Sequence, residues 1–239
     1  MGVHGTFQWP LEHGAPLGPQ VYQALRDRII RAELAPGALV SETEIARAFS
    51  ISRQPVREAF IKLADDGLVE IRPQRGTLVR KVHLGSVMDA RFVREAVEAE
   101  IVKIVARLGD PAIVADLRRQ IEAQRSVIDQ LPERFMDLDA RFHRSLASAA
   151  GKATVLRIVD NVKAQMDRVR FITLMDRSVV EVSIEQHAMV VDAIERGDPE
   201  AAEAAMRDHL RQVLKDLPLA AAIKPEFFED AAPVQNGIK

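Results

Sequence analysis

Three histidines and one aspartate in the second half of the chain have the residue types and the spacing of a metal site. Asp139 and His143 stand four residues apart, so on a helix they share one side. His187 and His209 each fall inside an apolar stripe of a later helical pattern, where a polar side chain needs a partner. Three imidazoles and a carboxylate suit a divalent Zn, Ni, Mn or Fe ion with open coordination positions. The alternative is that each histidine is a core residue bonded to a carbonyl or carboxylate.

Arg94 is a candidate for binding a small molecule that coordinates this ion. A guanidinium pairs bidentately with a carboxylate, so Arg94 could anchor a small organic acid at an open coordination position. The alternative is a surface ion pair with Glu98, four residues further along the same predicted helix.

A second group with recognisable chemistry opens the predicted helix SRQPVREAFIKL. Arg53, Gln54 and Arg57 lie on its exposed side, while Val56 and Phe60 point inward. Arginine can bond bidentately to guanine and glutamine to adenine in the major groove, so these three side chains are candidate readers of DNA. The alternative for any one of them is a solvated charge on an ordinary helix face.

A predicted hairpin follows this helix and supplies further DNA-binding candidates. Arg75, Gly76 and Thr77 lie near its tip, where they would reach the DNA backbone or the minor groove. Gly76 would also permit close approach of the backbone.

The elements that must position these groups divide the chain in two. Residues 19–83 contain three short helical patterns and the hairpin, which is the order of a winged helix-turn-helix. Within them, Ser41 and Glu44 form a capping box in which Ser41 would cap the Glu44 amide. Residues 84–217 are helical throughout, so the fold class is mainly α, with an all-helical bundle behind the winged domain. The helices expected there are 85–108, 111–131, 133–149, 152–176, 179–196 and 198–216.

The two ends show no such periodicity. Residues 1–18 are rich in glycine and proline and are expected to form a flexible arm, and residues 218–239 are expected to be a frayed tail.

The amino-acid composition excludes several structural and functional classes. The chain has no cysteine, which excludes disulfides, cysteine-ligated zinc fingers and thiol nucleophiles and fits a cytoplasmic location. No apolar run approaches the length of a membrane span, and the N-terminus lacks the features of a secretory signal, so no membrane association is expected. The front is weakly basic, with 11 Lys/Arg against 9 Asp/Glu in residues 1–83, and the remainder is acidic, with 22 against 26.

The front of the chain resembles the DNA-binding domain of GntR-family bacterial transcription factors. The likeness is carried by SETEIARAFSISRQPVREAFIKLADDGLVEI and by RGTLV, which match the ordered motifs of the family's second and third helices and its wing. Two positions depart from the pattern: Thr43 stands where many relatives have a DNA-contacting arginine, and Gln54 where many have threonine. Both departures affect which operator sequence the protein would bind, not whether it binds DNA.

The rear resembles the FCD ligand-binding domain of the FadR branch of that family. The motifs are ARFVREAVEAEIVKIVA, DLDARFHRSLASAAG, QHAMVVDAIERGD and MRDHL, and they carry the branch's metal ligands at Asp139, His143, His187 and His209. Lys152 stands where the family often has asparagine.

These likenesses imply a ligand-responsive bacterial regulator, a repressor, and not an enzyme. It would bind a pseudo-palindromic double-stranded operator as a homodimer and sense a small organic acid through the metal-containing domain. Two alternatives are a metal-dependent hydrolase, since such sites also activate water, and an acyl-CoA-sensing regulator that needs no metal.

Overall fold

The computed structural model describes residues 11, 12 and 14–229, and these form two units, each with its own core. One unit consists of the chain up to Leu84 together with a segment that begins at Pro225, and the other spans Gly85–Lys224. Ten residues of the predicted arm, 1–10, and residue 13 lie outside the described residues, and the first helix already begins at Leu17.

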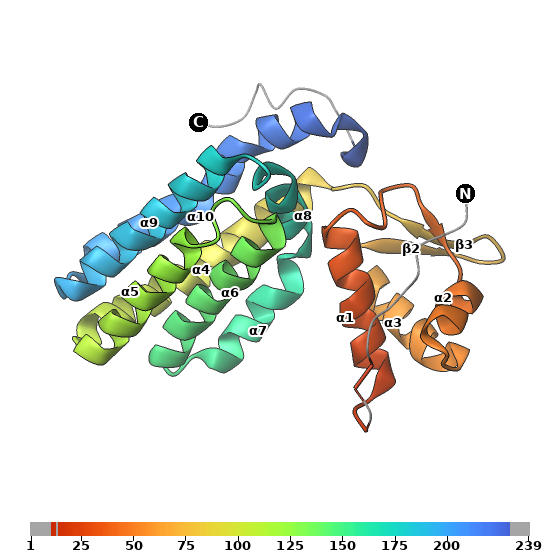
Figure 1. Cartoon of the computed structure of the whole chain (residues 1–239), viewed down its shortest axis with the longest axis horizontal. Helices are drawn as coiled ribbons and strands as arrows, with labels where there is room; N and C mark the ends of the chain where they lie inside the picture. Colours follow the sequence, from red (N-terminus) through yellow and green to blue (C-terminus); the bar gives the residue numbers. More distant parts are fainter. Residues whose placement is uncertain (1–10, 13, 230–239) are drawn as a thin grey trace. The chain divides into compact units, whose positions relative to one another are not determined.

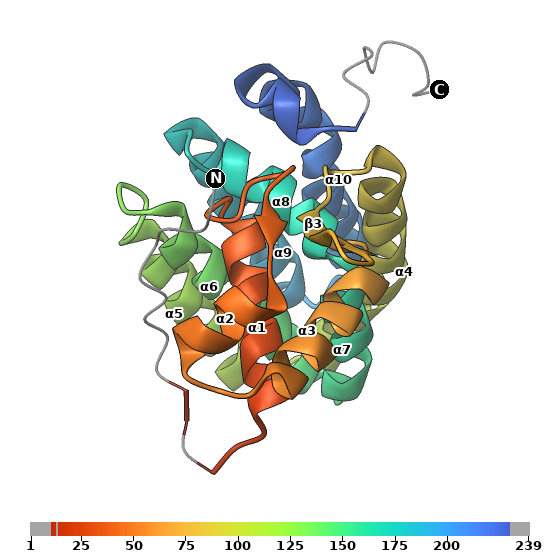
Figure 2. The ribbon, with the colours of Figure 1, turned by 90° about the vertical axis from the view of Figure 1, so that its right-hand side faces the viewer.

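The first unit is a winged helix-turn-helix, as the sequence predicted. Three helices contribute buried apolar side chains to its core, among them Leu25, Ile45 and Phe60; α1 (Leu17–Ile30) and α3 (Arg53–Asp65) lie side by side (Figure 2). A three-stranded antiparallel sheet in the order β1-β3-β2 adds the wing. The elements are α1 (Leu17–Ile30), β1 (Leu39–Val40), α2 (Glu42–Phe49), α3 (Arg53–Asp65), β2 (Val69–Arg72) and β3 (Gly76–Val79).

The capping contact at the start of α2 differs slightly from the expected capping box. The Ser41 hydroxyl accepts a hydrogen bond of 3.2 Å from the Thr43 amide, not from the Glu44 amide. Ser52, which precedes α3, makes no side-chain capping bond in the structure. Both residues still have extended backbone angles, so each marks the start of its helix.

The second unit is all helical in its described residues, again as predicted. Its helices pack in a bundle (Figure 1) and enclose an apolar core that includes Phe142, Val190, Val191 and Met206. Within the bundle, α9 packs against α5 and α10, and α10 also packs against α8. The elements are α4 (Leu84–Leu108), α5 (Pro111–Arg125), α6 (Pro132–Ala149), α7 (Ala153–Val162), α8 (Ala164–Thr173), α9 (Arg177–Glu195) and α10 (Pro199–Ile223).

Several of the helix boundaries expected in the bundle are corrected, and the first is the end of α5, which lies at Arg125 and not at 131. The single helix expected over 152–176 is two helices, α7 and α8, separated at Lys163. The fraying expected after Pro218 does not occur at that residue, because α10 continues to Ile223. Leu217 and Ala220 are buried on either side of the proline, and their packing holds this part of the helix in place. No helix among the described residues carries an apolar stretch long enough to cross a bilayer.

Candidate metal centre and DNA-binding surface

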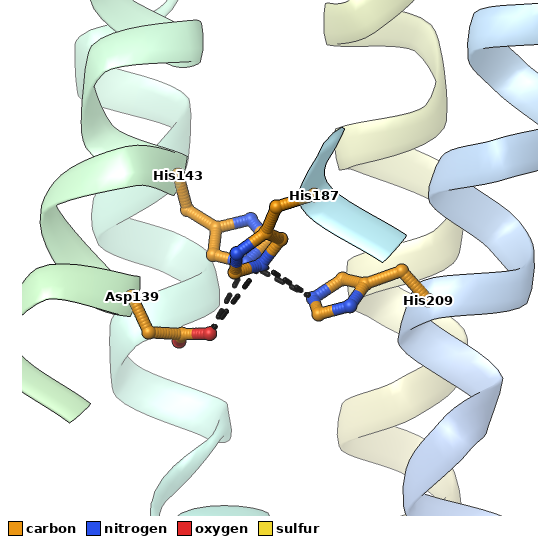
Figure 3. A group of neighbouring side chains, drawn as sticks. All are labelled: Asp139, His143, His187 and His209. Atoms are coloured by element: carbon orange, nitrogen blue, oxygen red, sulfur yellow. Dashed lines mark hydrogen bonds and ion pairs between the residues drawn. The ribbon is translucent and has the colours of Figure 1, made fainter. Parts of the chain in front are cut away.

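Four buried side chains from three helices of the second unit converge on one point. Asp139 and His143 come from α6, His187 from α9 and His209 from α10, and Figure 3 shows their polar ends turned toward one another. One ligand atom of each lies within 4.8 Å of those of the others. None of the four side chains of the predicted metal site faces bulk water, since all are buried.

The distances within this cluster fit a small divalent ion. Nε2 of His209 lies 3.2 Å from Nε2 of His187 and 3.3 Å from Nε2 of His143. Oδ1 of Asp139 lies 3.5 Å from Nε2 of His187 and 4.0 Å from Nε2 of His143. A tetrahedral ion with ligand bonds of about 2.1 Å separates its ligands by about 3.4 Å, close to these values. The four atoms could therefore hold one metal with little movement.

Each imidazole is oriented by a side-chain oxygen at its other ring nitrogen. The contacts to Nδ1 are 2.5 Å from Glu98 to His143, 2.8 Å from Gln124 to His187, and 3.2 Å from Gln186 to His209. In every pair the oxygen comes from a different helix than the histidine does. An oxygen beside Nδ1 favours the proton there and leaves the Nε2 lone pair directed at the common point, which is the state a metal needs.

These three orienting residues are missing from the sequence prediction. Gln124 stands in an ordinary helical pattern, Gln186 opens the motif QHAMVVDAIERGD but was given no role there, and Glu98 was considered only as a surface partner of Arg94. Two of the three lie on the inner side of a helix, since Glu98 is 3% exposed and Gln124 is fully buried, whereas Gln186 is half-buried.

The charges in the cluster also suit a cation. Burial lowers the pKa of His187 to about 3, despite the nearby Asp139 carboxylate, and burial likewise holds the pKa of His209 well below its usual value. Both imidazoles are therefore neutral near pH 7. Burial by itself would raise the pKa of Asp139, but the Arg170 guanidinium and, to a smaller extent, His143 and His187 together hold this pKa well below the ordinary value. The centre thus combines neutral nitrogens with one ionised carboxylate.

Arg94 lies at the edge of this cluster and is buried, in contrast to the surface pair considered for it. Its Nε donates a 2.6 Å hydrogen bond to Glu98, and its Nη2 lies 3.3 Å from Nε2 of His143. Arg94 and Arg170 line a cavity of about 20 Å³ beside His209, which Asp216 also lines. That volume holds about one water molecule. A larger ligand would have to displace side chains of the surrounding helices.

The predicted DNA-reading side chains of the first unit lie together on α3. Arg53, Gln54 and Arg57 are exposed, while Val56 is fully buried behind them. Both arginines are paired with a single carboxylate of α2: Glu42 accepts at 2.9 Å from Arg53 and at 3.1 and 3.2 Å from Arg57. These bonds, chiefly those from Arg57, lower the pKa of Glu42. Glu42 was not predicted as a functional residue.

Only part of the DNA-binding group predicted in the wing is exposed. Arg75 and Gly76 are exposed at the turn, and Gly76 has a φ of +88°, which favours glycine. The prediction that Thr77 reaches DNA is not supported, because its side chain is only 4% exposed. Thr77 lies in β3, the central strand, where it is paired with Val40 on one side and Ile71 on the other.

Two family models together cover most of the chain. The model for "Bacterial regulatory proteins, gntR family" matches residues 17–79, and the model for the FCD domain matches residues 89–212. The chain belongs to the GntR family. As a GntR-family protein with an FCD domain, it joins the winged unit and the helical unit in the order that the sequence motifs indicated.

Similar proteins agree with this assignment. The GntR-family chain is 36% identical to the HTH-type transcriptional repressor RspR of Escherichia coli K12 over 210 residues, which cover 87% of this chain and 92% of RspR. It is 40% identical over 222 residues to an HTH-type transcriptional regulator of Streptomyces ambofaciens, covering 91% and 93% of the two chains. The family and these relatives are transcriptional regulators, not enzymes.

Solved structures share the fold. Escherichia coli McbR/YncC superimposes with a TM-score of 0.73 at 17% identity, covering 86% of this chain and 98% of McbR/YncC. A GntR transcriptional regulator from Rhodococcus sp. RHA1 superimposes with a TM-score of 0.66 at 27% identity, covering 83% and 97%.

Proposed function

We propose that this GntR-family regulator is a cytoplasmic, metal-containing repressor whose affinity for operator DNA changes when a small organic acid binds its FCD domain. The observation that carries the proposal is the convergence of Asp139, His143, His187 and His209 from three helices, with each imidazole oriented through Nδ1. With the protons on Nδ1, the Nε2 atoms and the Asp139 carboxylate face one another as acceptors, an arrangement that a cation satisfies and that a plain apolar core does not need.

The ion proposed for this centre is divalent, and the donor set admits Zn, Ni, Mn or Fe. When bound, it would offer a Lewis-acidic position to an anionic ligand. Nε2 of His143, which lies 3.3 Å from Arg94 in the structure, would then use its lone pair toward the ion. Arg94 would lose that acceptor and would be available to a carboxylate in the adjoining cavity.

The size of that cavity suggests how an effector would act. It holds about 20 Å³, so an organic acid can enter only if side chains of the helices that line it, α4, α8, α9 and α10, move. Such a ligand discriminates between two conformations of the unit, which is the requirement for any ligand to shift a regulatory equilibrium.

For the DNA-binding unit we propose that Arg53, Gln54 and Arg57 read bases in the major groove and that Arg75 and Gly76 lie against the DNA backbone or minor groove. The exposure of these residues supports the assignment. A homodimer would place two α3 helices on the half-sites of a pseudo-palindromic operator.

The test has two parts that use the purified full-length chain. Elemental analysis is expected to find about one divalent ion per chain, lost from the His187→Ala variant and kept in the His83→Ala control, whose histidine lies outside the cluster. Selection from a random pool of DNA duplexes is expected to return an inverted repeat. Arg57→Ala should then weaken binding to it on the order of ten- to a hundredfold.

Each part has its own contradicting result. A full complement of metal in His187→Ala would place the ion elsewhere and refute the centre. Selection that returns no preferred sequence, or unchanged affinity in Arg57→Ala, would refute the assignment of the α3 residues. A metal-free protein that binds an acyl-CoA thioester with high affinity would favour the alternative regulator.

A further inference from the structure

The last described residues of the chain return to the DNA-binding unit. α10 ends at Ile223, and after Lys224 the segment Pro225–Glu229 belongs to the first unit, not to the helical bundle from which it emerges. Figure 1 shows α10 in blue running directly into this short turn. Within the described residues, the chain therefore passes between the two units twice, once at the start of α4 and once at the end of α10.

Backbone hydrogen bonds hold this segment against the residue that follows the wing. The Val82 amide donates to the carbonyl of Phe227 at 2.7 Å, and the Glu229 amide donates to the carbonyl of Val82 at 3.1 Å. The two segments thus form a parallel bridge between Val82 and Phe228. The Arg80 guanidinium adds an ion pair with Glu229 at 3.4 Å. We call residues 225–229 the strap.

The strap belongs to the first unit, and both of its phenylalanines are buried. Phe228 is 3% exposed and Phe227 is 8% exposed, while Val82 is fully buried. Two adjacent phenylalanines near a chain end would otherwise present a large apolar surface to water, so their burial favours the bound position of the strap.

The strap, which follows α10, is bonded to the chain just before α4, and both helices carry residues at or beside the proposed metal centre. Val82 lies two residues before Leu84, where α4 begins, and α4 carries Arg94 and Glu98. On the other side, the strap follows α10, which carries His209. The two connections between the units are therefore bonded to each other at one place, directly after β3 of the wing.

We propose that the strap is a mechanical coupling between the metal centre and the wing: movement of α10 at His209 is transmitted through Pro225–Glu229 to Val82 and β3. This inference rests on the proposed function for its purpose, since it names the route by which that centre would regulate DNA binding. This coupling requires two states of the protein, which differ in the fraction of time for which the hydrogen bonds between Val82 and the strap are formed.

The experiment is hydrogen exchange on the full-length chain with and without Zn²⁺, comparing the unaltered protein with Phe228→Ser. The matched control is Ile223→Ser, which makes the same kind of change at a side chain that is already 44% exposed at the end of α10. In the unaltered protein, Zn²⁺ is expected to change exchange at residues 80–82 and at the strap together. In Phe228→Ser, exchange at 80–82 should rise about tenfold or more and no longer respond to Zn²⁺.

The outcomes separate the strap from the metal centre. Protection around His143, His187 and His209 on adding Zn²⁺ reports the centre itself, and it should survive in both variants. If that protection appears while residues 80–82 respond equally in the unaltered protein and in Phe228→Ser, or do not respond in either, the coupling is refuted and the metal centre stands. If Zn²⁺ slows exchange around none of the three histidines, the metal centre is refuted. The proposed coupling from that centre to the wing is then refuted as well. A rise at 80–82 in Ile223→Ser equal to that in Phe228→Ser would also overturn the role of the strap.

Discussion

Arg170 holds both carboxylate oxygens of Asp139, with Nη1 donating to Oδ2 and Nη2 donating to Oδ1 at 2.8 Å each. Both side chains are largely buried. Oδ1 is also the oxygen nearest the histidines, at 3.5 Å from His187. Arg170 therefore supplies, in the metal-free protein, the positive charge that an ion would bring to the same carboxylate.

Replacing Arg170 by methionine should destabilise the metal-free protein strongly. The change leaves Asp139 as an uncompensated buried charge, which costs about 3–5 kcal/mol in the free energy of unfolding. Added Zn²⁺ should then stabilise Arg170→Met more than it stabilises the unaltered protein, because the ion replaces the lost charge. Denaturant unfolding with chelator and with Zn²⁺ measures both effects.

A control for this experiment is Arg118→Met. Arg118 pairs with Asp192 and Glu195 on a partly exposed surface, so its loss should cost much less and should not alter the response to Zn²⁺. Equal zinc stabilisation in Arg170→Met and the unaltered protein would show that Asp139 is not a ligand.

Removing an orienting contact should weaken metal binding without disturbing the fold. Gln124→Met keeps the length of the side chain but deletes the oxygen that lies 2.8 Å from Nδ1 of His187. Loss of such a partner costs roughly 10- to 100-fold in metal affinity, which competition with a chelating dye can measure. Gln120→Met is the control, since Gln120 is on the same helix and bonds to Asp116 and Ser145 instead. A Zn²⁺ affinity in Gln124→Met that matches this control would argue against orientation through Nδ1.

Acid should destabilise the metal-free protein before most carboxylates titrate. The pKa of His187 is about 3 in the folded chain against an ordinary 6.5, so between these values the unfolded state binds a proton that the folded state does not. Stability is therefore full above about pH 6.5 and falls by about 1.4 kcal/mol per pH unit for each such histidine as the pH decreases. Urea unfolding from pH 7.5 to 4.5 in the presence of chelator tests this slope. His187→Gln should show a shallower one, and an identical slope in both proteins would contradict a buried neutral His187.

Glu42 should govern selectivity for DNA sequence more than affinity for DNA. Its carboxylate holds Arg53 and Arg57 together, so Glu42→Gln should loosen both guanidinium groups and lower the ratio of specific to non-specific binding several-fold. Binding to the selected duplex and to a scrambled duplex, each over a range of salt concentrations, measures that ratio. Glu44→Gln removes the same charge from an exposed position of α2 and controls for the change in net charge. The idea fails if both variants lower the ratio equally.

Local sequence patterns determined the elements of this protein and the residue types of its sites. Helical periodicity and capping residues are properties of neighbouring positions, so the winged unit, the helical bundle and the pairing of Asp139 with His143 on one helix could be inferred without coordinates. The apolar stripes around His187 and His209 marked both as buried for the same reason.

Only the tertiary structure decided what these groups contact, because the contacts join residues far apart in the chain. Gln124 reaches His187 across 63 positions, and Arg170 reaches Asp139 across 31. Thr77 lies in a central strand because a third strand, β1, pairs with β3, and Phe228 lies beside Val82 because residues 225–229 return to that part of the chain. Periodicity predicts which side of an element faces inward, but the partner on that side depends on how the elements pack together.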